Sequence, residues 1–183
     1  MTLVFATSNV NKFNEAKSIL KIRILRKDIK LDEMQSIRTE RVARYKALQA
    51  YDKLKVPVIV EDTGLYITEF NGFPGALIKW TAAGIGYERI CRLVDLCKNR
   101  NAYAETCVAF YDGKEIRTFI GRIDGKIAMH PKGRRNFGWD YIFMPKGSAK
   151  TFAQISISEK NKVSMRRVSF EKLHRFLASR KLV

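Results

Sequence analysis

The chain has 183 residues, of which 46% are hydrophobic, and this size and composition predict a single domain over residues 1–183. It contains no run of 18 apolar residues and its N-terminus lacks a basic signal-peptide start, so we expect neither a membrane span nor secretion. The formal net charge of +17 favours an anionic partner, which could be a nucleotide, a nucleic acid or an acidic membrane.

The three cysteines, Cys91, Cys97 and Cys107, match neither a disulfide framework nor a zinc-binding pattern. Cys91 and Cys97 lie in an apolar helical pattern, and we therefore expect buried free thiols. Free thiols are typical of a reducing compartment, which predicts a cytoplasmic location.

The N-terminal segment predicts a strand, a polar loop and a helix. Residues 2–6 are apolar and β-prone, residues 7–12 are small and polar up to Lys12, and apolar residues then recur at helical spacing from Phe13. Such a loop offers backbone N–H groups, the positive end of a helix and an ammonium, which together suit phosphate. The glycines of a Walker loop are missing, and an ordinary helix cap by Ser8 or Asn9 explains the same pattern.

The next elements are a strand over residues 22–26 with a basic outer face, a polar connection over 31–35, and a helix from Glu40 to Leu54. Lys46 lies on the alanine side of this helix, where an apolar residue is the easier choice. Its side chain therefore either extends along the surface to reach water or contacts an anion.

Residues 58–65 carry the main acidic signal. Val58 to Val60 form a predicted buried strand that ends at Glu61 and Asp62, and Gly64 is expected to turn the chain. Two adjacent carboxylates repel each other and require a cation nearby. Their oxygen ligands suit Mg²⁺, although a strand that ends in a solvated acidic turn is the alternative.

The middle of the chain predicts turns and antiparallel pairing. Residues 71–75 form a turn cluster, residues 88–98 an amphipathic helix, and residues 102–111 and 117–123 a hairpin joined at Asp112-Gly113. A second turn is expected at Asp124-Gly125, and a basic loop follows over residues 130–136.

The C-terminal part places Phe137 and Trp139 on either side of Gly138. Two aromatic rings in this arrangement could stack on a flat ligand or form a turn with core aromatics. A polar loop is expected over residues 158–162, before a last helix with apolar positions from Met165 to Leu177. Helices and strands alternate early and hairpins follow, which predicts an α/β fold with a mixed sheet.

Taken together, the motifs resemble the inosine triphosphate pyrophosphatase family, in the right order over nearly the whole chain. The matching segments are residues 5–12 with Glu15, 32–35, 45–47, 60–65, 71–75, 137–140, 159–161 and 164–166. Two positions depart from the family pattern, since Ser8 replaces a usual glycine and Met165 replaces a histidine that helps to recognise the purine.

The resemblance implies an elongated mixed sheet flanked by helices, with two lobes around a central nucleotide cleft, and a homodimer. It also implies Mg²⁺-dependent hydrolysis of non-standard purine nucleoside triphosphates (inosine, deoxyinosine and xanthosine triphosphate) to the monophosphate and pyrophosphate. In this hypothesis Glu33 and Asp62 hold the metal, with Glu61 as a third candidate, and Asp62 is the catalytic base. The implied substrate-binding residues are Thr7, Ser8, Asn9, Lys12, Lys46, Thr63, Phe137, Gly138, Trp139, Asp140, Lys160, Met165 and Arg166.

Arg166, or a backbone N–H, is the predicted donor to the 6-oxo group of the purine. Two alternatives to this enzyme stay open at this stage. The first is a related pyrophosphatase that acts on modified pyrimidine or guanine nucleotides. The second is a basic nucleic-acid-binding module without catalysis, and weak, nonspecific nucleic-acid binding could also accompany the enzyme.

Overall fold

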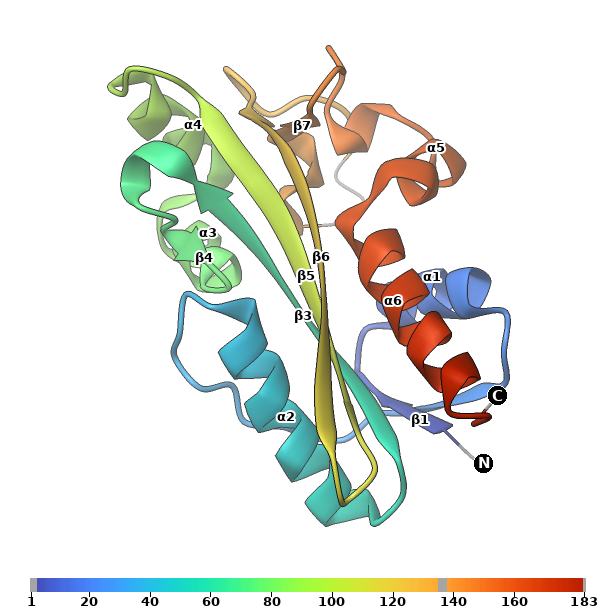
Figure 1. The fold of residues 1–183 in the computed structure, drawn as a ribbon. Coiled ribbons are helices and arrows are strands. Elements are labelled where there is room, and N and C mark those ends of the chain that lie inside the picture. The colour runs from blue at the N-terminus through green and yellow to red at the C-terminus, as the bar shows by residue number, and fades with distance from the viewer. Residues whose placement is uncertain (1–2, 135–137, 183) are drawn as a thin grey trace.

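The computed structural model describes residues 3–134 and 138–182, which form one mixed sheet surrounded by helices (Figure 1). The seven strands of the sheet have the order β2-β1-β3-β5-β6-β7, with β4 added beside β3. The strands are β1 (Leu3–Ala6), β2 (Ile24–Lys27), β3 (Val58–Ile67), β4 (Pro74–Gly75), β5 (Asn101–Tyr111), β6 (Ile116–Ile127) and β7 (Phe143–Pro145). The α-helices are α1 (Val10–Leu20), α2 (Thr39–Leu54), α3 (Ile78–Ile85), α4 (Tyr87–Asp95), α5 (Ile157–Val163) and α6 (Met165–Ser179).

β1 runs parallel to β2 and β3, whereas the remaining pairs are antiparallel. The prediction of an α/β fold with a mixed sheet is therefore confirmed. The hairpin of β5 and β6 is also confirmed, and the Asp112 carboxylate accepts hydrogen bonds from the backbone N–H groups of Lys114 and Glu115 at its turn.

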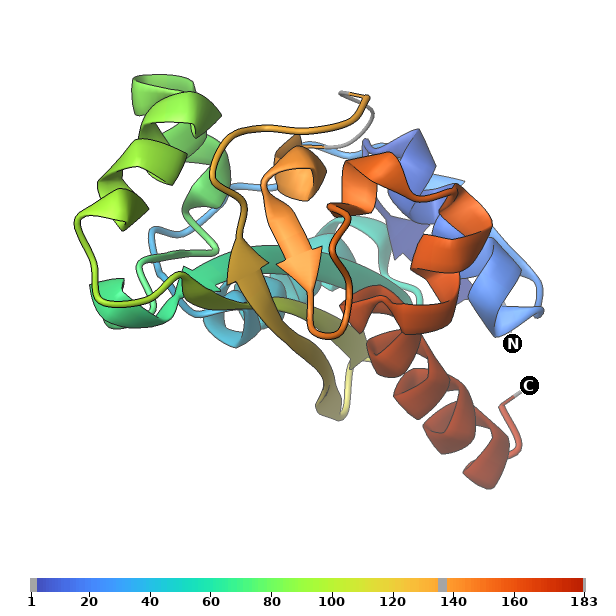
Figure 2. The same cartoon turned by 90° about the horizontal axis from the view of Figure 1, so that it is seen from above.

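Three buried clusters attach the helices to the sheet. On one face α2 packs Ala43, Ala47 and Ala50 against Val58 and Val60, as its helical spacing predicts. On the other face α1 and α6 pack over β1 and the adjoining part of β3. The third cluster joins α3 and α4 to the far ends of β3 and β5, so that α3 and α4 lie across the molecule from α1 and α6 (Figures 1 and 2).

The prediction that the strand ends at Glu61 and Asp62 is wrong, because β3 continues to Ile67 and stays paired with β5. The parallel neighbour of β3 does end near this point, because β1 pairs with Val58 and Ile59 of β3 and with no later residue of that strand. Gly64 is a strand residue with no turn. A Cβ there would lie 2.7 Å from the Tyr66 ring and 2.8 Å from the carbonyl carbon of Gly75, so the close approach of β4 requires glycine.

Two further local predictions are wrong. Gly125 pairs with Ala102 and Pro145 inside β6, where a Cβ would lie 2.3 Å from the Met144 carbonyl oxygen. Residues 158–162 belong to α5, which Ser156 and Glu159 cap reciprocally. This capping box is a recognised sequence signal for a helix start.

Within the described residues, no helix is long and apolar enough to cross a membrane. The three cysteines are unpaired, and Cys91 and Cys107 are buried whereas Cys97 is partly exposed. Burial raises the pKa of the Cys91 thiol to about 11. The expectation of a buried thiol is thus confirmed for Cys91 and only in part for Cys97.

We expect Gly64→Ala to destabilise the protein by about 1–3 kcal/mol, because the added methyl group overlaps β4 and the Tyr66 ring. Gly84→Ala is the matched control, since a Cβ at this position in α3 meets nothing within 4 Å. It should gain about 0.5–1 kcal/mol of helix stability. Urea unfolding measures both changes, and equal stability of the two variants would contradict the steric argument.

Candidate active site

A cavity of about 280 Å³ opens where β1 ends beside β3. The lining residues come from the end of β1 and the loop after it, the first turn of α1, the connection before α2, α2 itself, β3 and α3. They are Ala6, Thr7, Ser8, Asn9, Lys12, Ile29, Leu31, Glu33, Lys46, Val60, Glu61 and Lys79. The predicted phosphate loop and Glu33 thus meet Lys46 in one hollow, although they are far apart in the sequence.

The loop before α1 is shaped by its own side chains. Asn9 caps the helix, since its Oδ1 accepts a hydrogen bond from the Lys12 N–H at 3.0 Å. Thr7 Oγ1 accepts from the Asn9 N–H at 3.1 Å. Ser8 is not among the residues with positive φ, so the loop does not need a glycine at that position. The loop therefore both caps α1 and forms part of the cavity wall. The interpretation as a helix cap is thus compatible with the interpretation as a phosphate loop.

Lys46 connects the two predicted metal ligands. Its Nζ lies 2.6 Å from Glu33 Oε1 and 3.1 Å from Asp62 Oδ1. Burial opposes the charge of this ammonium, but the carboxylates outweigh that effect and raise the pKa of Lys46. The lysine on the alanine side of α2 thus contacts anions, and the alternative of a side chain that only reaches for water is wrong.

Asp62 carries an unsatisfied oxygen. The residue is 8% exposed, and its Oδ2 has no hydrogen-bond partner among the described residues. Burial raises the pKa of Asp62, and Lys46 and Lys12 offset this only in part. Asp62 does not line the 280 Å³ cavity. It contacts Lys46, and Lys46 does line that cavity.

Glu61 leaves β3 on the opposite side from Asp62, as neighbours in a strand must. Arg166 Nε and Nη2 donate to its two oxygens at 2.8 and 2.9 Å, Lys12 Nζ lies 3.2 Å away, and Thr63 Oγ1 donates at 2.8 Å. Burial opposes the charge of this carboxylate, but Arg166 and Lys12 lower the pKa of Glu61 to about 2. Arg166 also binds Glu15, and its side chain is fully buried.

The donor set fits a hard divalent cation at Asp62 and Glu33. Mg²⁺ takes one or two carboxylates and completes its coordination with water and phosphate. The Asp62 Oδ2 atom is buried and has no donor in the part of the chain that the structure describes. Glu61 fits less well, because its oxygens already bind Arg166, Lys12 and Thr63. In the described parts of the chain, no group of three or more His, Cys, Asp or Glu side chains is arranged to hold a metal ion.

A second cavity of about 540 Å³ lies between α1 and α5. Asp140 and Lys160 line it and form a buried ion pair, and Asp140 Oδ1 has no hydrogen-bond partner among the described residues. Burial raises the pKa of Asp140, whereas Lys160 acts in the opposite direction.

The structure does not bring every predicted base-binding residue to this cavity. Trp139 is 6% exposed and packs edge-on against Phe143, and Met165 is a fully buried core residue. Gly138 begins the short 3₁₀ helix that carries Asp140. Phe137 lies outside the described residues. The buried position of Met165 means that its thioether belongs to the core and does not line the cavity.

Lys79 is a cavity residue that our sequence reasoning missed. It lines the 280 Å³ cavity with Lys12 and Lys46. Burial opposes the charge of Glu33, but Lys46, Lys79 and Lys12 together lower the pKa of that carboxyl. The sequence feature that could have identified this residue is a single lysine within the otherwise apolar segment 76–80.

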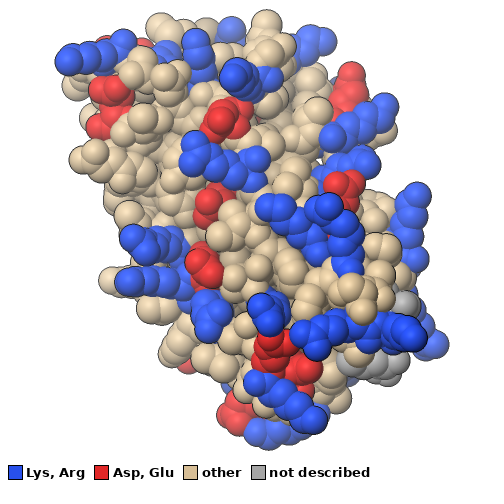
Figure 3. All heavy atoms as spheres, in the orientation of Figure 1, with Lys and Arg blue, Asp and Glu red and all other residues tan. Residues whose placement is uncertain are grey.

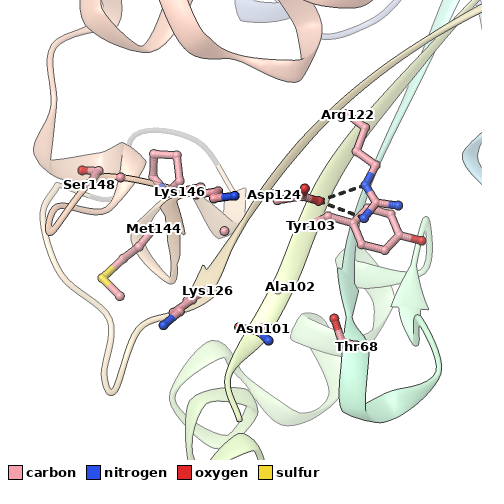
Figure 4. Close-up of a pocket in the computed structure, with 13 residues that line it drawn as sticks. Thr68, Asn101, Ala102, Tyr103, Arg122, Asp124, Lys126, Met144, Lys146 and Ser148 are labelled. Carbon is pink, nitrogen blue, oxygen red and sulfur yellow. Dashed lines mark hydrogen bonds and ion pairs between the residues drawn. The ribbon is translucent and has the colours of Figure 1, made fainter.

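Another hollow, of about 590 Å³, lies on strands β5, β6 and β7 (Figure 4). Its lining contains none of the predicted site residues. Arg122 Nη2 binds Asp124 Oδ1 at 2.8 Å, and its guanidinium lies 3.7 Å from the centre of the Tyr103 ring (Figure 4). Because the charges of Arg122 and Asp124 are paired, this hollow lacks the unsatisfied carboxylate oxygen of the Asp62 site.

The charge on the face drawn in Figure 3 is dispersed. Lys and Arg side chains are spread over this face, with Asp and Glu among them and no continuous basic stripe (Figure 3). A dedicated nucleic-acid-binding surface usually clusters its basic residues. This face therefore gives no support to such a module.

Comparisons with known proteins agree on one family. A family model described as the Ham1 family matches residues 3–176. A dITP/XTP pyrophosphatase of Methanopyrus kandleri is 40% identical over 176 residues, which cover 94% of both chains. An inosine triphosphate pyrophosphatase of Kluyveromyces lactis is 37% identical over 185 residues, covering 96% of this chain and 95% of that protein. The solved structure of the Staphylococcus aureus Ham1 protein superimposes with a TM-score of 0.85 at 26% identity, covering 98% of this chain and 100% of that one.

Proposed function

The chain belongs to the Ham1 family and is a nucleoside triphosphate pyrophosphatase, and from this premise we propose that it hydrolyses non-standard purine nucleoside triphosphates. The proposed substrates are inosine, deoxyinosine and xanthosine triphosphate, and the proposed products are the nucleoside monophosphate and pyrophosphate. The observation that carries the proposal is the buried, unsatisfied Asp62 oxygen beside Lys46 and Glu33, next to a cavity lined by lysines.

Phosphoryl transfer requires mainly positioning and charge neutralisation. We assign the neutralising charges to Lys12, Lys46 and Lys79, which line the 280 Å³ cavity. Glu33 and Asp62 would hold Mg²⁺, which supplies further charge neutralisation on the phosphate oxygens when bound. Lys46 then exchanges part of its contact with Glu33 and Asp62 for a phosphate, which its flexible ammonium allows.

Asp62 is the proposed general base. A base works best when its pKa lies near the working pH. Burial raises the pKa of Asp62 in the metal-free chain, and a bound Mg²⁺ would lower it again. Its Oδ2 has no donor to satisfy it in the described chain, so it can accept the proton of the attacking water. Lys46 on Oδ1 keeps the carboxylate oriented.

For base recognition we propose the 540 Å³ cavity between α1 and α5. Arg166, the donor expected from the sequence, gives its hydrogen bonds to Glu61 and Glu15. Lys160 lines the cavity, and we therefore assign to it the donation to the 6-oxo group. An adenine base would place its 6-amino donor against this ammonium, which leaves a buried donor unpaired.

A panel of nucleoside triphosphates tests the proposed function directly. With Mg²⁺ we expect pyrophosphate, and not orthophosphate, from inosine, deoxyinosine and xanthosine triphosphate. The mismatch of about 1–3 kcal/mol with adenine predicts a kcat/KM lower by about 5- to 150-fold for adenosine triphosphate. Addition of EDTA should abolish turnover. Equal rates on inosine and adenosine triphosphate would contradict the base assignment, and modified pyrimidine or guanine nucleotides as best substrates would favour the related pyrophosphatase.

We also propose a homodimer that works in the cytoplasm. Light scattering during gel filtration should give a mass of twice the 21.1 kDa chain. The net charge of +17 supports weak, nonspecific binding of nucleic acid beside the enzymatic activity. Such binding should vanish in a gel-shift assay as salt rises, while pyrophosphate release persists.

A further inference from the structure

A cavity of about 630 Å³ continues from the phosphate cavity on the side of α3. The two cavities share the lining residues Ser8, Ile29, Leu31, Glu33 and Lys79. The larger one adds Asp28, Lys30, Asp32 and Trp80. Because the two cavities adjoin at these residues, a phosphate chain held by Lys12, Lys46 and Lys79 can extend from the first towards the second.

Trp80 is the unusual member of this lining. It is 59% exposed and belongs to none of the three core clusters, although tryptophan is a large apolar residue. Lys79 Nζ lies 5.0 Å from the centre of its ring. An exposed indole beside a phosphate-binding lysine offers a flat face to a base at the end of a phosphate chain.

The lining of the cavity carries charges of both signs. Lys30 and Lys79 supply positive charge. Among the acidic residues, Asp28 pairs with Arg26 at 3.6 Å and Glu33 pairs with Lys46. Asp32 also lines the cavity, and its backbone N–H and carbonyl are both bound by the Gln49 side chain, which fixes the position of this segment.

We propose that this cavity receives the distal nucleoside of a dinucleoside polyphosphate, whose base stacks on Trp80 while Lys79 binds the phosphate chain. This inference rests on the proposed function, because the purine of the other nucleoside occupies the Asp140 cavity. Water attacks the phosphorus nearest that purine nucleoside, and the bond between the first and second phosphates breaks. With an inosine–adenosine tetraphosphate the products are inosine monophosphate and adenosine triphosphate, and the water supplies the oxygen and protons that balance the reaction.

The test compares this mixed dinucleotide, two nucleosides joined by four phosphates, with inosine triphosphate. Wild-type protein with Mg²⁺ should cleave both and release adenosine triphosphate from the dinucleotide. One stacked base is worth about 1–3 kcal/mol, so Trp80→Ala should lower kcat/KM for the dinucleotide by about 5- to 150-fold. The same variant should leave kcat/KM for inosine triphosphate unchanged, and Trp80→Phe should retain most of the dinucleotide activity.

Leu96→Ala is the matched control, because this exposed apolar residue lies just past the end of α4, outside the lining of both cavities. It should change neither activity. If wild-type protein cleaves inosine triphosphate but not the dinucleotide, the distal site is refuted while the proposed function stands. If Trp80→Ala lowers both activities equally, the stacking role is refuted. If neither compound is cleaved, the proposed function itself fails.

Discussion

Replacement of Asp62 by asparagine is expected to lower kcat by about 10²- to 10⁴-fold, the usual range for loss of a general base. The amide keeps the shape of the side chain but cannot accept the proton of the attacking water, and it is a poorer ligand for Mg²⁺. Lys46 keeps its 2.6 Å contact with Glu33, so the phosphate-binding lysines should stay in place. Nucleotide binding, measured by calorimetry, should therefore survive while pyrophosphate release is almost lost.

Asp124→Asn is the control for this prediction. Asp124 is an exposed carboxylate of β6 that pairs with Arg122 in the hollow of Figure 4, away from the proposed site. Loss of this pair should leave turnover unchanged. Near-normal turnover of Asp62→Asn would remove Asp62 from the chemistry, whereas equal losses in the two variants would point to a general effect of charge.

The largest effect on stability is expected at Arg166. Its guanidinium is fully buried and binds both oxygens of Glu61 as well as Glu15, so Arg166→Met removes the closest cation from the buried Glu61 carboxylate, which then has Lys12 at 3.2 Å. Removal of one partner of a buried pair costs about 3–5 kcal/mol. Urea unfolding should show this loss, and the double variant with Glu61→Gln should recover part of it, because the uncompensated charge is then absent.

The neighbouring arginine provides a matched control in the same helix. Arg167 pairs with Glu171 at 2.6 Å, but both side chains are about half exposed. Exposed pairs contribute only about 0–1 kcal/mol, so Arg167→Met should hardly change the free energy of unfolding. If the two variants lost similar amounts of unfolding free energy, burial of the Arg166–Glu61 pair would not explain its contribution to stability.

The same ion pair predicts a pH dependence. Arg166 and Lys12 lower the pKa of Glu61 from 4.5 to about 2 in the folded chain. A carboxyl with a depressed pKa stabilises the fold above its unfolded pKa, and that stability is lost as the pH falls through the folded value. The contribution is therefore complete above about pH 5 and disappears towards pH 2, amounting to about 3 kcal/mol. Glu61→Gln should flatten this part of the stability curve.

Local patterns were sufficient for much of the fold. The alanines of α2 recur at helical spacing and pack on β3, and Asp112-Gly113 joins β5 to β6 as its turn chemistry predicts. The ordered motifs pointed to the family that the comparisons found. Local patterns failed at Gly64 and Gly125, where glycine is present because another strand lies close and not because the chain turns.

The sequence by itself determined which chemical groups are available: the acidic pair of β3, the polar loop before α1 and the lysines around them. Only the tertiary structure decided which of these groups contact one another. Continued pairing with β5 sends Glu61 and Asp62 to opposite sides of β3, so that Arg166, 105 residues away, binds the first and Lys46 the second. The tertiary structure also brings Lys79 of α3 to the 280 Å³ cavity. Contacts between distant segments depend on how strands and helices pack together, and no local pattern of residues encodes that packing.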